Sequence, residues 1–270
     1  MAVAADKLDR SLHRIGRYRI HALHTGDGPP LVLLHGLSGS ARWWRNNVPA
    51  LAGHFRTHAP DLVGFGHSRT WAAQPTIPQM AELIVQWLEM NGIERTHLIG
   101  HSMGGQVAIH IAARWAERVD KLVLVSAAGI PRDLTLAAMT RFIAEIVPPR
   151  GWGKPAFLPT VATDALRAGP RSLIGAFNRL LHDDVRPHLA NIRAPTLLVW
   201  GALDPLTPLA NGEFMARQIA GARLVVFEDA AHMPMVDAPE RFNREVIDFL
   251  LGDGGMVGDG GIEDVEMHRG

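Results

Sequence analysis

The sequence predicts an α/β protein in which a mostly parallel sheet is covered by helices on both faces. Short apolar runs that end in glycine or a polar turn alternate with segments of three- and four-residue apolar spacing. This alternation is typical of strands joined by crossover helices. Hydrophobic residues make up 47% of the 270 residues and charged residues 20%, which indicates a soluble chain with a sizeable core.

The first half of the chain supplies four predicted strands and two predicted helices. The run "PPLVLLHG" is apolar on both faces, as in a strand buried inside a parallel sheet. The segment "TIPQMAELIVQWLEMNGI" has helical spacing and ends at a glycine, a common helix stop. Strands are expected at residues 29–36, 55–60, 96–100 and 121–129, and helices at 76–93 and 104–119.

The second half continues the alternation after an interruption. Strands are expected at 194–201 and 222–228, with helices at 211–221 and 239–251. Residues 130–193 carry seven prolines among short apolar pieces, so we expect a small helical cap whose prolines interrupt its helices. The predicted core is then 1–129 with 194–251, and the glycine-rich tail 252–270 is expected to be disordered.

Charge and composition exclude several classes of function. Lys+Arg and Asp+Glu balance at 27 each, so no long-range field attracts nucleic acid or an anionic membrane. The absence of cysteine removes disulfides and cysteine-ligated zinc. No run reaches the roughly 20 apolar residues that a membrane span needs. The first residues lack the apolar segment of a signal peptide, so a cytoplasmic protein without membrane insertion is expected.

The motif Gly-His-Ser-Met-Gly, residues 100–104, lies between a predicted strand and a predicted helix. A glycine two residues before and two after Ser102 permits a sharp turn that exposes the serine hydroxyl above the sheet. The motif alone occurs by chance in many proteins, and a turn that merely contains serine is the alternative. Its position between strand and helix favours a nucleophile.

A serine nucleophile needs a base and an acid that orients the base. Asp204 follows the strand at 194–201, and His232 follows the strand at 222–228. The aspartate before a proline is also compatible with an ordinary turn, and His232 is one of 14 histidines. Three such residues at strand ends, in the order Ser, Asp, His, favour a catalytic triad.

The oxyanion of an acyl-transfer intermediate requires two backbone donors. The Met103 N–H stands at a predicted helix N-terminus, and the Leu37 N–H follows the first buried strand across the crevice. His35 in the same loop is expected to brace the loop by hydrogen bonding rather than to act as a base. No motif supports a metal site, and "LVGFGHS" lacks the helix and acidic residue of a dinucleotide fingerprint.

Residues 16–251 resemble the α/β-hydrolase superfamily, and most of all its compact, lid-bearing bacterial esterases and lipases. The resemblance rests on the motifs "HGLSGS", "DLVGFGHS", "GHSMGG", "WGALDPLTP" and "AAHMPMVDAPERFN". It implies an eight-stranded, mostly parallel sheet, a helical cap after the sixth strand, and no cofactor. Residue by residue, it implies Ser102 as nucleophile, Asp204 as acid, His232 as base, and Leu37 and Met103 as oxyanion donors.

The expected activity is hydrolysis of a small carboxylic ester through an acyl-enzyme. Lactonase, acyltransferase or perhydrolase, carbon–carbon hydrolase and a non-catalytic ligand-binding role remain open on the same fold, as does the oligomeric state. Apolar side chains expected to line the substrate pocket are Trp43, Phe142, Trp152 and Phe177, although the cap residues among them fit a small cap core equally well.

Overall fold

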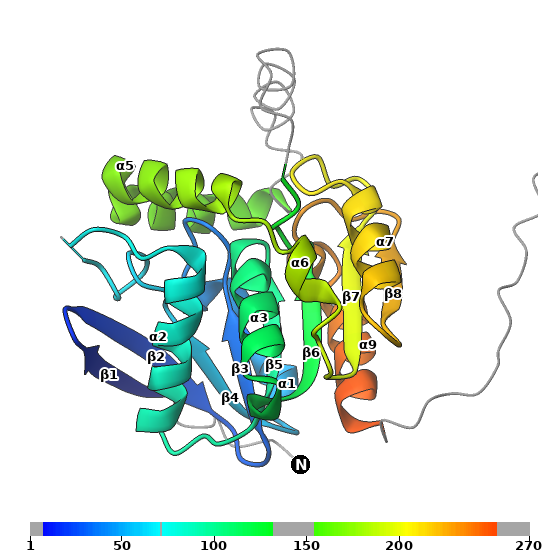
Figure 1. Ribbon diagram of the computed structural model, residues 1–270, viewed down its shortest axis with the longest axis horizontal. Helices are drawn as coiled ribbons and strands as arrows, with labels where there is room; N and C mark the ends of the chain where they lie inside the picture. The colour runs from blue at the N-terminus through cyan, green and yellow to red at the C-terminus, as the bar shows by residue number, and fades with distance from the viewer. Residues whose placement is uncertain (1–7, 71, 132–153, 253–270) are drawn as a thin grey trace, which may run out of the picture.

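The computed structural model describes residues 8–70, 72–131 and 154–252. Figure 1 shows a central sheet between two layers of helices, with one long helix lying across its top. The predictions for Phe142, Trp152 and residues 253–270 fall outside the described residues.

The sheet has eight strands within the described residues, in the order β1-β2-β4-β3-β5-β6-β7-β8. β1 pairs with β2 and β2 with β4 in antiparallel fashion, and every other pair is parallel. The predicted mostly parallel, eight-stranded sheet is therefore confirmed. The strands are β1 (Asp9–Ile15), β2 (Tyr18–Thr25), β3 (Pro30–Leu34), β4 (Arg56–Pro60), β5 (Thr96–His101), β6 (Val119–Val125), β7 (Thr196–Gly201) and β8 (Arg223–Phe227).

Helices cover both faces of the sheet and enclose two hydrophobic clusters. One cluster packs under α2 (Ile77–Met90), α3 (Met103–Arg114), α6 (Arg186–Leu189) and α7 (Leu209–Gln218). The other packs under η1 (Ala41–Trp44), α1 (Val48–Leu51), α8 (Pro234–Asp237) and α9 (Pro239–Leu251). The short 3-10 helices η2 (Ala116–Arg118) and η4 (Pro155–Phe157) lie in connections.

Helix α2 illustrates how local sequence sets an element. Thr76 caps its N-terminus by accepting from the Gln79 N–H, and the Gln79 side chain accepts from the Thr76 N–H, a complete capping box. Gly92, with φ 67°, follows the last turn in a conformation that a side chain would strain. The predicted stop at this glycine is confirmed.

The hairpin of β1 and β2 was not anticipated from the residues themselves. Its turn uses Gly16 at φ 58°, and Ile20 and Ala22 of β2 are fully buried. β1 is an edge strand whose side chains are mostly exposed or half-buried, so it needs few apolar residues. Because β1 faces water on one side, it carries charged residues, and its sequence lacks the apolar run by which the other strands were predicted.

Between β6 and β7 the described chain forms η4, α5 (Leu158–His182) and α6. Within residues 154–193, the expectation that prolines interrupt every helix holds for α5 and is wrong for η4 and α6. Pro155, Pro159 and Pro187 stand in first turns, where proline's missing N–H has no intrahelical partner to lose. Only the step at Gly169, with φ 75° and ψ 161°, and Pro170 kinks α5. The boundaries of a separate cap remain a prediction.

None of the helices in the described parts of the chain has the length and apolar character required to cross a membrane.

Candidate active site

Ser102 occupies a strained turn between β5 and α3. Its backbone has φ 52° and ψ −115°, a region that L-residues rarely adopt. A Cβ at Gly100 would lie 2.5 Å from the Gly104 carbonyl oxygen, and one at Gly104 would lie 2.4 Å from the Leu34 carbonyl oxygen. The two glycines are therefore required by close backbone contacts, as the motif predicted.

The backbone around Ser102 is held by the neighbouring strand and by α3. The Ser102 N–H donates to the Val125 carbonyl at 3.0 Å, and the Ala128 N–H donates to the Ser102 carbonyl at 3.1 Å. Met103 is the first residue of α3, so its N–H belongs to the helix N-terminus, where developing negative charge is favoured. The predicted donor thus stands directly beside Ser102.

The predicted acid and base meet at the ends of β7 and β8. The His232 Nδ1 lies 2.9 Å from Asp204 Oδ2 and 3.1 Å from Oδ1. Both side chains are buried, with residue exposures of 4% for His232 and 6% for Asp204. Since Nδ1 is engaged by the carboxylate, Nε2 is the nitrogen left for proton transfer.

Asp204 is also held by Thr207, whose contribution the sequence did not reveal. The Thr207 hydroxyl donates to Asp204 Oδ2 at 2.6 Å, and the N–H groups of Leu206 and Thr207 donate to Oδ1 at 2.8 and 2.9 Å. The spacing Asp-x-x-Thr resembles a capping turn and gave the only available signal. Thr207 orients the carboxylate toward His232.

The charge state of Asp204 follows from these contacts. Burial alone would raise the pKa of this carboxyl, but the charge and hydrogen bond of His232, together with the Thr207 hydrogen bonds, hold the pKa below its ordinary value. Asp237, a competing acid by sequence proximity, instead accepts from the Ala231 N–H at 3.0 Å, and burial raises its pKa. The geometry thus pairs His232 with Asp204.

His101 is a second residue whose contribution the sequence did not reveal. Its ring is fully buried, with Nε2 2.9 Å from the carbonyl oxygen of His232 and ring centroids 4.9 Å apart. Burial is the main reason that its pKa falls to about 3, so the ring is neutral and its Nε2–H donates. This bond joins the residue preceding Ser102 to the backbone of His232.

The loop after β3 carries the other predicted oxyanion donor, Leu37. His35 Nε2 accepts from the Leu62 N–H at 2.9 Å, and its Nδ1 donates to the Gly36 carbonyl at 2.8 Å. Burial lowers the pKa of His35, consistent with a neutral ring in both bonds. The histidine therefore braces the loop, and Ser38 within it has a positive φ of 66°.

The aromatic residues assigned to the substrate pocket are only partly placed near these groups. Trp43 is buried, with its ring centroid 5.8 Å from His101 and 6.3 Å from Phe157. Trp44 packs against Phe242 in the same hydrophobic cluster as Trp43 and Phe157. Phe177 of α5 is half-buried. Trp43 thus stands next to the motif that bears Ser102.

Helix α5 is tied to the loop that precedes η1. The Ser40 hydroxyl donates to Asp164 Oδ2 at 2.7 Å, and Arg45 donates to the Thr160 hydroxyl at 2.6 Å. Asp164 is 1% exposed, and its Oδ1 has no hydrogen-bond partner within the described residues. The far end of α5 is held at Asp183, which accepts from the side chains of Gln106 and His110 on α3.

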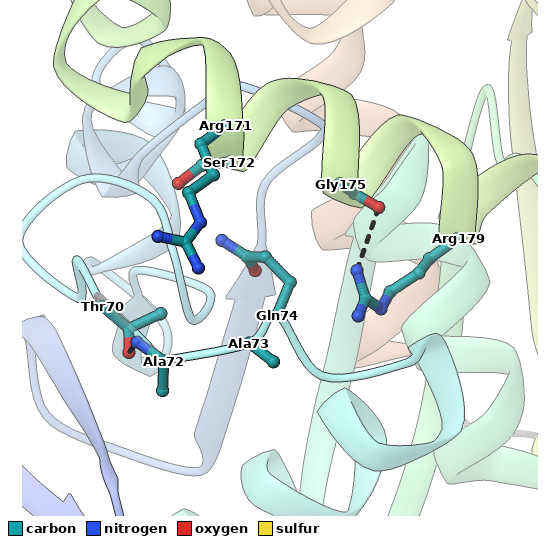
Figure 2. Close-up of a pocket in the computed structure, with 8 residues that line it drawn as sticks. All are labelled: Thr70, Ala72, Ala73, Gln74, Arg171, Ser172, Gly175 and Arg179. Atoms are coloured by element: carbon teal, nitrogen blue, oxygen red, sulfur yellow. Dashed lines mark hydrogen bonds between the residues drawn. The ribbon is translucent and has the colours of Figure 1, made fainter.

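Among the cavities lined by described residues, two border α5. The larger, about 200 Å³, lies between α5 and the chain before α2, where Arg171 and Arg179 flank Gln74 (Figure 2). Neither Trp43 nor Phe177 lines it, so this cavity is not the pocket expected around those aromatic side chains. A smaller cavity of about 40 Å³ is lined by Leu180 and Leu181 of α5 and by Thr207.

The strained serine at a strand–helix turn and the buried histidine–carboxylate pair define a hydrolase-like site on a doubly covered parallel sheet. A sequence profile of the α/β-hydrolase fold matches residues 29–181 and 167–239. The chain belongs to the α/β-hydrolase family.

Individual relatives support the same placement. A pimeloyl-[acyl-carrier protein] methyl ester esterase of Nitrosomonas europaea is 32% identical over 83% of this chain and 96% of its own length. The structure is similar to an enol-lactonase from Burkholderia xenovorans, with 25% identity and TM-score 0.79 over 90% of this chain and all of the other. A hydrolase from Pseudomonas aeruginosa gives 28% identity and TM-score 0.78 over 90% of this chain and 99% of its own.

Proposed function

We propose that this chain is a serine hydrolase that cleaves small carboxylic esters through an acyl-enzyme. The observation that carries the proposal is the buried Asp204–His232 pair on the same sheet edge as Ser102. The His101–His232 hydrogen bond links the two parts of this site. The esterase relative of Nitrosomonas europaea supports the ester as substrate class.

In the proposed mechanism, the Ser102 hydroxyl attacks the ester carbonyl while His232 Nε2 takes its proton. Asp204 holds the imidazole in the required tautomer and stabilises the imidazolium. The N–H groups of Met103 and Leu37 bind the tetrahedral oxyanion, each donor contributing roughly 3 kcal/mol in comparable sites. The proton passes to the leaving alkoxide, and water then repeats the attack on the acyl-enzyme.

Residues 130–193 are proposed to form a cap over this edge, and Trp43 and Phe177 are proposed to contact the acyl group. The ties of α5 to Ser40 and to α3 support this placement above the strand ends. The proposed setting is the cytoplasm, and the proposed partner is a small ester rather than a nucleic acid or a membrane.

A lactone is the second candidate substrate, because it is a cyclic carboxylic ester cleaved by the same steps. The likeness to an enol-lactonase at TM-score 0.79 favours its inclusion. Ring opening leaves the alcohol attached to the acyl group, so a lactone and an open-chain ester of the same size separate the two preferences.

The test is a panel of p-nitrophenyl esters of graded acyl length, beside methyl esters and lactones, with wild type and Ser102→Ala. The variant should keep the fold and lose several orders of magnitude in kcat, because no other group replaces the nucleophile. Ser126→Ala is the matched control. Ser126 is also buried with a positive φ of 43°, and it follows the neighbouring strand β6. Turnover that survives Ser102→Ala, or is lost equally in Ser126→Ala, contradicts the proposal.

A further inference from the structure

Three metal-ligating side chains from two parts of the chain, none of them a member of the candidate triad, converge beside the sheet. His21 lies on β2, while Asp61 and His67 lie in the loop that follows β4. One ligand atom from each side chain lies within 4.8 Å of the other two. This cluster plays no part in the ester chemistry proposed above.

Both imidazoles direct the same nitrogen at one carboxylate oxygen. The His21 Nδ1 lies 3.1 Å from Asp61 Oδ2, and the His67 Nδ1 lies 3.4 Å from the same atom. The two ring centroids are 4.6 Å apart at an interplanar angle of 44°. A single oxygen thus faces two ring nitrogens, an arrangement that one shared cation satisfies.

The carboxylate is fixed in advance by the backbone. Asp61 is buried, its Oδ1 accepts from the Ala41 N–H at 2.7 Å, and its Oδ2 accepts from the His67 N–H at 2.8 Å. A Cβ at Gly66 would lie 2.3 Å from Asp61 Cγ, so a residue without a side chain lets the loop close around the carboxylate. The Asp61 carboxylate is therefore already oriented, and binding of a cation would cost little further side-chain entropy.

The two nitrogen–oxygen distances suit a small divalent ion with mixed ligands, and the two nitrogens, which lie within 4.8 Å of each other, reach such an ion when the exposed His67 ring turns. Donors about 2.1 Å from a tetrahedral centre are roughly 3.4 Å apart, close to both nitrogen–oxygen distances. His67 has 63% of its side chain exposed, against 14% for His21 and 1% for Asp61. The exposed ring is therefore free to turn onto an ion, and the solvent side leaves room for water as a fourth ligand.

We propose that His21, Asp61 and His67 form a binding site for a late first-row divalent cation, of which zinc is the representative. Two imidazole nitrogens and one carboxylate oxygen form a ligand set that zinc accepts, whereas calcium and magnesium prefer oxygen alone. The site is independent of the proposed esterase activity. It binds a cation without supplying a group to Ser102.

The test is titration of the chelator-treated full chain with zinc chloride by calorimetry, in a buffer that does not bind zinc. Wild type should bind one equivalent with a rise in Tm, since an ion that binds only the folded state stabilises it. His67→Ala should weaken binding at least about tenfold, and the exposed ring makes this substitution tolerable to the fold. His21→Ala should act in the same way.

Two controls separate this site from other histidines. His54 is exposed at a distant turn, so His54→Ala should bind zinc as wild type does. The Asp204–His232 pair is another place where zinc would find an imidazole beside a carboxylate, and the one-to-one complex should therefore persist in His232→Ala. Equal affinity in wild type and His67→Ala, loss of binding in His232→Ala, or the lack of a saturable one-to-one isotherm overturns the proposal.

Discussion

The carboxyl edge of the sheet and the helix α5 that lies across it are built in opposite ways. At the edge, a Cβ added at Gly100 or Gly104 would lie 2.4–2.5 Å from a backbone carbonyl oxygen, and Ser102 is held in a strained conformation. Along α5, a Cβ added at Gly169 would meet no atom within 4 Å, and Leu166 and Ile174 are 83% and 70% exposed. The geometry of the proposed catalytic groups is thus set by backbone contacts, while α5 is attached by a few polar contacts and a few apolar side chains such as Leu173, Ala176 and Leu180.

The difference shows which part of the molecule holds its side chains in a fixed geometry. The groups proposed for catalysis sit where several backbone segments constrain each other, which limits their freedom. Helix α5 instead depends on contacts such as Ser40–Asp164 and His110–Asp183. Segments with few buried contacts belong to the low-stability end of a protein, where covers of active sites are commonly drawn from.

The largest expected effect tests the edge itself. Asp204→Asn should keep the shape of the site but lower kcat by roughly 10³–10⁴-fold, because an amide favours the wrong imidazole tautomer. Asp237→Asn is the control, since Asp237 bonds the Ala231 N–H rather than His232. Steady-state kinetics on one p-nitrophenyl ester distinguishes the two. If Asp237→Asn lost activity while Asp204→Asn remained active, Asp237 rather than Asp204 would be the acid of the triad.

Local sequence signals account for the parts of this edge that were predicted. The Gly-x-Ser-x-Gly spacing identified Ser102 because its chemistry depends on neighbours along the chain, and strand ends indicated Asp204 and His232. Their 2.9 Å contact, however, depends on β7 and β8 lying side by side, which the residues alone did not establish.

Other features could not be predicted because the residues that form them are common residue types at ordinary positions in the sequence. Thr207 and His101 act through tertiary hydrogen bonds to Asp204 and to the His232 backbone, and neither residue type at these positions is unusual. The β1–β2 hairpin carried too many polar side chains to stand out. The effect of proline depends on its place in a helical turn: Pro170 kinks α5, whereas Pro155, Pro159 and Pro187 stand in first turns and interrupt nothing.

The second effect concerns stability and contrasts the two regions directly. Gly104→Ala should cost about 3 kcal/mol of unfolding free energy or more, because its Cβ would meet two backbone carbonyl oxygens at 2.4 and 2.6 Å. Gly169→Ala should cost about 1–2 kcal/mol, the cost of an unusual backbone conformation in open space. Urea denaturation of both variants gives the comparison. Equal losses would show that α5 is as constrained as the edge.

A smaller effect appears in the pH dependence of stability. Burial lowers the pKa of His101 to about 3, against 6.5 in an unfolded chain. Between these values the unfolded state binds more protons, so the free energy of unfolding falls as pH decreases from about 6.5 toward 3, and the contribution of His101 is complete above 6.5. The slope from this group is at most about 1.4 kcal/mol per pH unit.

The variant His101→Gln isolates that contribution, because its amide can still donate to the His232 carbonyl without titrating. Denaturation at several pH values should give a shallower decline than in wild type, by up to one proton. His58, whose burial lowers its pKa to about 4, remains in both proteins and cancels in the difference. Parallel curves for the two proteins would mean that His101 has the same pKa in the folded and the unfolded state.

The smallest effect is expected on α5. Phe177→Ala should shift the acyl-length optimum or raise KM severalfold while the best kcat changes little, because the helix is proposed to shape the acyl pocket without supplying catalytic groups. Phe177 is half-buried, so some loss of stability is expected as well, and Tm is measured beside kinetics. Leu166→Ala, at an 83% exposed position of the same helix, controls for a general effect on α5.

A Phe177→Ala profile that coincides with wild type while Tm falls would place the acyl pocket elsewhere and leave Phe177 as a packing residue of α5. A shift in optimum in Phe177→Ala alone would show that this loosely attached helix selects the substrate while the constrained edge performs the chemistry.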